Sequence, residues 1–338
     1  MMAEPILQVR DLGVDFSTED GFVHAVRGVS FDLHPGEALG VVGESGSGKS
    51  VSSMALMGLL PRTARITGSV RYRGEELVGR SNKELRRFRG SRIAMIFQDP
   101  MTSLNPVHTV GRQIAEAVLA HHDVGRAEAW KRAVHMLDVV GIPQADRRAS
   151  SYPHEFSGGM RQRAMIAMAI VNDPDVIIAD EPTTALDVTV QAQIIETLNE
   201  IRERTSAGMI LITHDLGVVA GMVDHVQVMY AGKVVETGTA EDIFYRPRMP
   251  YTAGLLGSMP SLEGESKRLV PIKGAPPSLI NLPAGCPFSP RCPLADQHCQ
   301  QNEPELGEVG PMHNAACFRS HVLAEYDDPR ELFLGTPA

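Results

Sequence analysis

The chain has 338 residues, of which 43% are hydrophobic and 22% are charged, and it carries a formal net charge of −9. This composition excludes a disordered or fibrous protein, and the length favours two domains or one large domain with an appendage. The acidic balance disfavours a nucleic-acid partner, because neutralising phosphates over a broad surface requires clustered Lys and Arg.

The N-terminal residues 1–10 include Glu4 and only a brief apolar stretch, unlike the basic and then apolar design of a secretory signal. The longest apolar runs, such as residues 164–171, fall well short of the roughly 20 residues needed to span hydrocarbon. We therefore expect the chain to stay inside the cell and, if it works at a membrane, to rely on other subunits for the spans.

The first predicted element of the core is a buried strand over residues 38–42, which leads into a loop that fits G-x-x-x-x-G-K-S. In such a loop the glycines let backbone N–H groups converge on phosphates at a helix N-terminus, and the lysine reaches the β and γ phosphates. The last serine ligates Mg²⁺. A glycine-rich turn with a solvated lysine is the alternative. The residues of the predicted phosphate loop are Gly43, Ser45, Gly46, Ser47, Gly48, Lys49 and Ser50.

The second buried strand is predicted over residues 93–97 and is followed by Gln98, a polar residue at a strand end. Farther along, residues 110–140 carry apolar side chains at helical spacing, among them Ile114, Val118 and Leu137. This pattern predicts a helical subdomain inserted at about residues 100–165.

A second helix start with an affinity for anions is predicted at Ser157-Gly158-Gly159, directly before a helix-like apolar segment. An ordinary capped helix is the alternative.

The third predicted strand, residues 176–179, places Asp180 and Glu181 at its end. Charge at the end of a buried strand is unfavourable unless it faces a cation or a reacting water. Asp180 is expected to help hold Mg²⁺, and Glu181 to orient and deprotonate an attacking water. Two solvated acids at a strand end are the alternative.

The fourth predicted strand, residues 209–213, is followed by His214, and a strand, a tight turn and a second strand are expected over residues 226–236. Buried runs that alternate with helix-length segments are typical of an α/β fold with a mostly parallel sheet. Ligands of such sheets gather at the carboxyl ends of the strands, so we expect the chemistry on one edge.

Composition changes beyond residue 245. Prolines recur densely over residues 247–293, which disfavours regular helix or sheet there. We predict a domain boundary near this point, with a nucleotide-binding domain over residues 1–245 and a C-terminal extension over residues 246–338. All four cysteines of the chain lie in the extension.

The motif at Ser157, Gly158 and Gly159 resembles the signature motif of ABC ATPases. Phe156 and Met160 depart from its commonest form, which has Leu and Gln at these positions, but the serine and both glycines are kept. The resemblance covers roughly residues 5–240 and is specific because several separate motifs agree in order and spacing. The other matching positions are Gln98 as the Q-loop glutamine, Ala185-Leu186-Asp187 as the D-loop and His214 as the switch histidine.

The resemblance implies a P-loop ABC ATPase core that binds ATP and Mg²⁺, with an antiparallel β subdomain and an inserted helical subdomain. It further implies that two such domains pack head to tail, so that each ATP lies between one phosphate loop and the signature motif of the other chain. Phe16 is the candidate for stacking on adenine, with core packing as the alternative. The catalytic residues so implied are Glu181, His214 and Gln98, the Mg²⁺ ligands are Ser50, Gln98 and Asp180, and the further nucleotide contacts are Ser157, Gly158, Gly159 and Asp187.

Two regions are similar to the ATPases of oligopeptide and dipeptide importers, in the style of the first, D-type, of their two ATPase subunits. They are residues 98–106, around the Q-loop, and residues 274–293 of the extension. The resemblance implies two transmembrane permease subunits, a second homologous ATPase, an extracytoplasmic substrate-binding protein, and a peripheral location on the cytoplasmic face of the inner membrane. An importer of nickel or glutathione is an alternative within the family, and a soluble ABC ATPase acting on nucleic acid or the ribosome is a remote one.

Cys286, Cys292, Cys299 and Cys317 are predicted to bind a metal centre, because the 285 residues before Cys286 contain no cysteine. Disulfides are disfavoured in a reducing cytosol, whereas four unrelated core cysteines remain an alternative. Structural zinc sites usually use close C-x₂₋₄-C pairs, and the spacings here are longer. Members of the resembled family can carry an iron–sulfur cluster in this extension, so a [4Fe-4S] cluster is expected, with zinc as the alternative.

Overall fold

The computed structural model describes residues 4–19, 21–184, 186–258 and 271–333, apart from the side chain of Val218. Ala185 of the predicted D-loop and residues 259–270 of the proline-rich stretch lie outside this description. The chain forms two compact units. The first consists of Met1–Gln8, Asp32–Glu37 and Arg71–Ile212, and the second of Val9–Phe31, Ala38–Val70 and Thr213–Ala338.

A parallel arrangement of three strands forms the core of the first unit. β6 (Ile93–Ile96) pairs with β7 (Val176–Asp180), which pairs in turn with β8 (Gly208–Thr213). Every residue of these strands is buried, as expected for parallel strands covered on both faces. Three predicted strands are therefore confirmed, although β6 ends one residue early and leaves Phe97 exposed.

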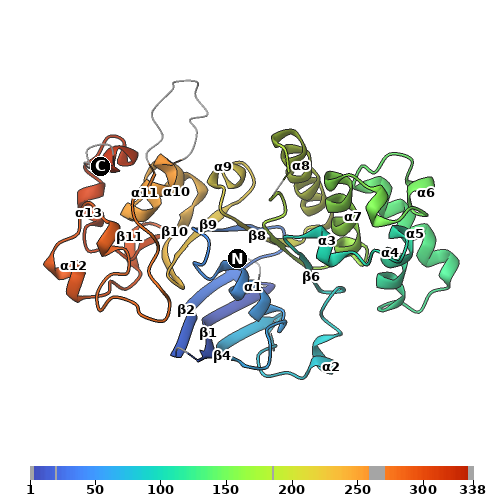
Figure 1. Cartoon of the computed structure of the whole chain (residues 1–338), viewed down its shortest axis with the longest axis horizontal. Coiled ribbons are helices and arrows are strands. Elements are labelled where there is room, and N and C mark those ends of the chain that lie inside the picture. Colours follow the sequence, from blue (N-terminus) through green and yellow to red (C-terminus); the bar gives the residue numbers. More distant parts are fainter. Residues whose placement is uncertain (1–3, 20, 185, 259–270, 334–338) are drawn as a thin grey trace. The chain divides into compact units, whose positions relative to one another are not determined.

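Two helices of the first unit, α4 (Val110–Leu119) and α5 (Arg126–Val139), confirm the helical pattern predicted over residues 110–140. Figure 1 shows them in green beside α7 (Gly158–Ile170). Their buried positions recur every four residues, which places the apolar side chains of each helix on one face. The other elements of this unit are β5 (Glu75–Glu76), α2 (Asn82–Leu85), α3 (Pro100–Ser103), α6 (Ala145–Arg148), η1 (Pro153–Glu155) and α8 (Val188–Thr205).

The second unit holds most of β2 (Gly21–Leu33), β1 (Leu7–Thr18) and β4 (Ala64–Tyr72), which are neighbours in that order and appear in blue in Figure 1. It also holds β3 (Ala38–Val42), whose five residues are all buried and which pairs in parallel with β9 (His225–Tyr230). The strand predicted over residues 38–42 is confirmed at both ends.

The predicted antiparallel hairpin is formed by β9 and β10 (Lys233–Thr239). The turn residues Ala231 and Gly232 have φ values of 48° and 82°, and a two-residue hairpin turn with positive φ at both positions matches the twist of the strands. Beyond β10 the sheet continues through β12 (His313–Ala315) to β11 (Gly307–Gly310), so the extension adds two strands to this unit.

The expectation that regular structure is absent from the proline-rich stretch is wrong for α11 (Pro250–Gly257). Pro250 occupies the first helical position, where its missing N–H leaves no intrahelical bond unmade, and Tyr251, Thr252 and Ala253 are buried. The remaining elements of the second unit are α1 (Lys49–Leu56), α9 (Leu216–Val219), α10 (Ala240–Tyr245), η2 (Ser289–Arg291), α12 (Gln297–Gln301), α13 (Ser320–Leu323) and η3 (Pro329–Phe333).

Within the described part of the chain, none of the helices combines the length and the apolar character that crossing a membrane requires.

Candidate active site

The phosphate loop connects the end of β3 to the start of α1, and its glycines are required by close backbone contacts. A Cβ at Gly43 would lie 2.2 Å from the carbonyl oxygen of Met229, and one at Gly48 would lie 2.4 Å from that of Ala25. Their φ values of 152° and 102° fall in the region that favours glycine. The glycines therefore let the loop close tightly over the strand ends of its own unit.

Lys49 and Ser47 give this loop the features of an anion cradle. The Lys49 ammonium is buried and donates to the carbonyl oxygens of Gly43, at 2.7 Å, and Glu44, at 3.0 Å. The Ser47 Oγ is also buried and finds no hydrogen-bond partner among the described residues. A Cβ at Gly46 would meet no described atom within 4 Å, so the loop is open there. These groups fit nucleotide phosphates at the N-terminus of α1, where Ser50 also lies.

In the first unit, Glu181 is held at the end of β7 by two side chains. Its Oε2 accepts hydrogen bonds from Gln98 Nε2 at 3.0 Å and from Thr184 Oγ1 at 2.8 Å. Asp180, the preceding residue, is 3% exposed. The structure thus brings together Gln98 and Glu181, which sequence analysis predicted as catalytic. The sequence did not predict a role for Thr184. Its hydroxyl lies only three residues after Glu181, which is close enough in the chain for a local hydrogen bond to the carboxylate.

The signature motif lies at the N-terminus of α7. Ser157 is the N-cap, and its side chain accepts a hydrogen bond from the Met160 N–H at 3.4 Å. A Cβ at Gly159 would lie 2.7 Å from Cγ1 of Val190 on α8, whereas one at Gly158 would meet Leu186 at an ordinary 3.7 Å. The motif is therefore both a helix cap and a close contact between α7 and the start of α8.

Three further residues predicted to contact nucleotide are exposed or half-buried. Asp187 is exposed and caps α8 by accepting from the Val190 N–H at 3.0 Å. His214 is exposed directly after β8, and Phe16 is half-buried in β1. The predicted roles of these three residues remain predictions.

The four cysteines line one small cavity of about 20 Å³ in the second unit. Burial raises the pKa of all four thiols, and that of Cys292 and of Cys317 to about 12, with a further contribution from the neighbouring thiols at these two. Among the described residues, no group of three or more His, Cys, Asp or Glu side chains is arranged to hold a metal ion. The described part of the extension thus brings four thiols to one cavity without forming a metal site.

Two family models match the chain. The model described as "ABC transporter" matches residues 26–184, and the model described as "Oligopeptide/dipeptide transporter, C-terminal region" matches residues 235–299.

Several proteins of known name are similar over nearly the whole chain. The oligopeptide transport ATP-binding protein of Escherichia coli is 53% identical over 94% of this chain and 94% of its own length. The dipeptide transport ATP-binding protein of Bacillus subtilis is 52% identical over 96% of this chain and 97% of its own length. The oligopeptide transport ATP-binding protein of Mycobacterium tuberculosis is 56% identical over 94% of this chain, but the chain spans only 52% of that relative.

Solved structures show the same fold. The cbiO1 protein of Clostridium perfringens, part of an ABC transporter complex, is 28% identical, with a TM-score of 0.61 over 72% of this chain and 92% of its own. A dimeric ATP-binding cassette in a post-hydrolysis state bound to ADP and phosphate has a TM-score of 0.63 over 69% of this chain and 98% of its own, and its 24% identity supports the fold alone. The predicted α/β ABC ATPase fold is confirmed.

Proposed function

The chain belongs to the ABC transporter ATP-binding proteins that carry the oligopeptide/dipeptide C-terminal region, and from this premise we propose that it hydrolyses ATP to energise peptide import. The phosphate loop carries the ATPase part of this proposal, because its buried Lys49 and Ser47 are presented at a helix N-terminus. The peptide part is supported by the names of relatives that are more than 50% identical over nearly their whole length.

The phosphate loop is proposed to bind the nucleotide. Its backbone N–H groups and Lys49 hold the β and γ phosphates, and the Ser47 hydroxyl donates the bond that its burial leaves unmade among the described residues. Mg²⁺, when bound, neutralises the charge that develops on the phosphates. Ser50, Asp180 and Gln98 are its proposed ligands, directly or through water. Phe16 is retained as the proposed adenine contact.

Glu181 is proposed as the general base. Gln98 and Thr184 donate to its carboxylate, which orients the group, and the carboxylate is proposed to accept a proton from the attacking water. His214 is proposed to stabilise the reacting γ phosphate. This division of roles follows the chemistry of phosphoryl transfer, where positioning and charge stabilisation do most of the catalysis.

The signature residues Ser157, Gly158 and Gly159 are proposed to complete the nucleotide site of a second ATPase chain, with Asp187 beside them. Their support is the exposure of Ser157 and Gly158 at the N-terminus of α7, where N–H groups favour a γ phosphate. ATP then bridges two chains, and hydrolysis removes the bridge, so the nucleotide shifts the population of closed dimers.

The proposed partners are two membrane permease subunits, a second homologous ATPase and, through the assembly, an extracytoplasmic substrate-binding protein. The proposed location of the chain is peripheral, on the cytoplasmic face of the inner membrane. Nickel chelates or glutathione are alternative cargoes. The boundary between a nucleotide-binding domain over residues 1–245 and an extension over residues 246–338 also remains a proposal.

The thiols of Cys286, Cys292, Cys299 and Cys317 are proposed to hold a [4Fe-4S] cluster, supported by their convergence on one cavity. Metal analysis of anaerobically purified protein tests this proposal. Iron and sulfide in equal amounts, with visible absorption, are expected. Colourless protein with stoichiometric zinc replaces the cluster with a zinc site, and metal-free protein with a folded extension defeats both.

The transport proposal is tested with the purified assembly of permeases, both ATPase chains and the binding protein in vesicles. Peptide delivered by the binding protein is expected to stimulate ATP hydrolysis and to accumulate inside the vesicles. Stimulation by a nickel chelate or by glutathione, but not by peptides, would change the cargo. Absence of hydrolysis in the complete assembly would remove the ATPase role.

A further inference from the structure

Arg291 of the C-terminal extension forms a bidentate ion pair with Glu44 of the phosphate loop. The two N···O distances are 2.6 Å from Nη1 to Oε2 and 2.8 Å from Nη2 to Oε1. The Arg291 side chain is only 5% exposed, so the guanidinium has little contact with water. A bidentate pair in such a setting is among the stronger and more directional interactions available to a protein.

The surroundings of Arg291 fix its position. Its Nε donates to the Lys273 carbonyl at 3.0 Å, and its Nη1 also donates to the Tyr230 hydroxyl at 3.2 Å. The guanidinium lies 5.9 Å from the ring centre of Tyr230 and 5.8 Å from that of Phe288. These rings pack against each other and against Tyr251, which gives Arg291 a rigid aromatic support.

Glu44 is bound at each of its polar groups. Its carboxylate meets Arg291, and its N–H donates to the Tyr251 hydroxyl at 2.7 Å. Its carbonyl oxygen accepts from Lys49 Nζ at 3.0 Å and from the Ser47 N–H at 3.2 Å. The extension therefore contacts the side chain of a residue whose backbone carbonyl binds Lys49 and Ser47 of the phosphate loop.

The charge of Glu44 gives this contact a consequence for nucleotide binding. A carboxylate in the phosphate loop repels the negative phosphates of ATP, and the repulsion is strong where water is partly excluded. Arg291 cancels that charge without presenting its own guanidinium to solvent. The ion pair therefore has almost no net charge, so it repels a bound phosphate only weakly.

We propose that Arg291 is a positioning residue for ATP binding, which acts from the C-terminal extension by neutralising the charge of Glu44 in the phosphate loop. The inference rests on the proposed function and deepens it, because it makes the extension a part of the nucleotide-binding apparatus.

The test compares ATP affinity, measured by calorimetry on the full chain, for Arg291→Gln, Glu44→Gln and the double variant. Arg291→Gln leaves the Glu44 carboxylate unpaired and is expected to weaken ATP binding roughly tenfold. Glu44→Gln removes the repulsive charge and is expected to bind ATP as tightly as the parental chain or more tightly. The double variant is expected to return to within about threefold of the parental affinity.

A merely structural role predicts a different pattern, because either single substitution breaks the same ion pair and would weaken binding alike. Equal losses in Arg291→Gln and Glu44→Gln, or a double variant no better than Arg291→Gln, would overturn the electrostatic proposal. If Arg291→Gln does not fold, weaker binding by Glu44→Gln alone still overturns it, and unchanged or tighter binding supports it.

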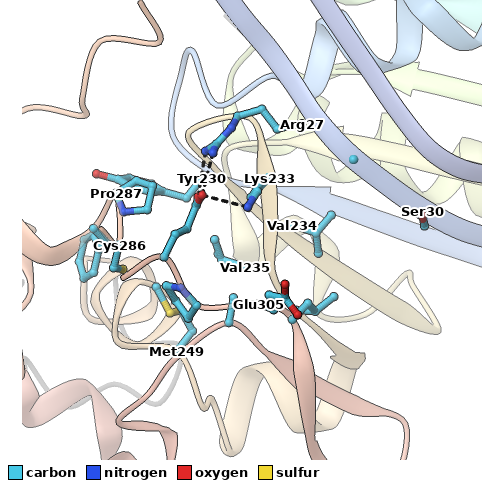
Figure 2. Close-up of a pocket in the computed structure, with 16 residues that line it drawn as sticks. Arg27, Ser30, Tyr230, Lys233, Val234, Val235, Met249, Cys286, Pro287 and Glu305 are labelled. Carbon is cyan, nitrogen blue, oxygen red and sulfur yellow. Dashed lines mark hydrogen bonds and ion pairs between the residues drawn. The ribbon is translucent and has the colours of Figure 1, made fainter. Parts of the chain in front are cut away.

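Arg27 offers a matched control. It forms a bidentate pair with Glu303 of the same extension, at 3.0 and 2.8 Å, without touching Glu44. Lys233 Nζ also lies 3.1 Å from that carboxylate, and in Figure 2 dashed lines mark the interactions of Arg27 and Lys233. Arg27→Gln is expected to keep the parental ATP affinity, and a loss equal to that of Arg291→Gln would overturn the specific role of Arg291. A parental chain that binds no ATP would instead refute the proposed function.

Discussion

At the scale of single residues, Glu181 combines a constrained backbone with an oriented side chain. Its φ of 47° lies in a region that is unfavourable for a residue other than glycine, and such strain is found where a functional group must be aimed. Its N–H donates to the Ile212 carbonyl at 2.8 Å, and its carboxylate accepts from Gln98 and Thr184. Backbone and side chain are thus both fixed, as the proposed general base requires.

Glu181→Gln is therefore expected to keep ATP affinity while hydrolysis in the complete assembly falls by at least about a hundredfold, because an amide cannot accept the proton of the water. Single-turnover hydrolysis and nucleotide binding measure the two effects separately. Glu196→Gln, at an exposed position of α8, is the control and should retain the parental rate. Parental turnover in Glu181→Gln would exclude Glu181 as the base.

Lys49→Ala is expected to act on binding instead. The substitution removes the buried ammonium that is proposed to reach the phosphates and also its two bonds to the carbonyls of Gly43 and Glu44 in the loop. ATP affinity should fall by at least about tenfold, as measured by calorimetry. An unchanged affinity would argue against the loop as the nucleotide site.

At the scale of elements, Gly159 of the signature motif has both a packing contact and a proposed role in nucleotide binding. α7 begins where α8 comes close, and the contact from Gly159 to Val190 leaves no room for a Cβ. Val190 is β-branched and stiff in a helix, so it cannot turn away at low energy. At Gly158, one residue earlier, a Cβ would meet its nearest neighbour at an ordinary van der Waals distance of 3.7 Å.

Gly159→Ala is accordingly expected to destabilise the fold by about 1 kcal/mol relative to Gly158→Ala, because only the former overpacks the contact between α7 and α8. Chemical denaturation of both variants measures this difference. Equal stabilities would mean that α8 shifts to accept the added methyl group without loss of folding free energy. The requirement for glycine at position 159 would then come from nucleotide binding alone.

At the scale of the whole molecule, the signature motif is proposed to bind nucleotide, yet it lies exposed on the surface of the single chain. Ser157 and Gly158 are both exposed at the N-terminus of α7. An exposed helix start of this kind is available to a ligand held by another chain. The proposed ATPase is therefore incomplete in a single copy.

The specific rate of hydrolysis by the isolated chain is expected to be low and to rise with protein concentration, because dimerisation forms the complete site. Adding the second ATPase chain and the permeases should raise it further. A dilution series of turnover against oligomeric state, determined by light scattering, checks this expectation. A high rate that does not change on dilution to the monomer would refute the composite site.

Much of the fold could be predicted because its signals are local. Residues 38–42, 176–179 and 226–236 form strands where the apolar runs and the Ala231-Gly232 turn indicated them, and the phosphate loop is readable from the spacing of its glycines and Lys49. Helix α11 was mispredicted, because proline disfavours a helix interior but is well tolerated at the first position, and sequence alone did not place Pro250 there.

The sequence by itself determined the core strands and the motifs, and it predicted the chemistry that each motif supplies. Only the tertiary structure decided which distant residues meet: Gln98 binds Glu181 across 83 residues, Arg291 binds Glu44 across 247, and the four cysteines surround one cavity. The physical reason is that a turn, a cap or a buried strand depends on neighbours within a few residues. A side-chain contact over such separations depends on how strands pair and how the extension packs, which no local pattern specifies.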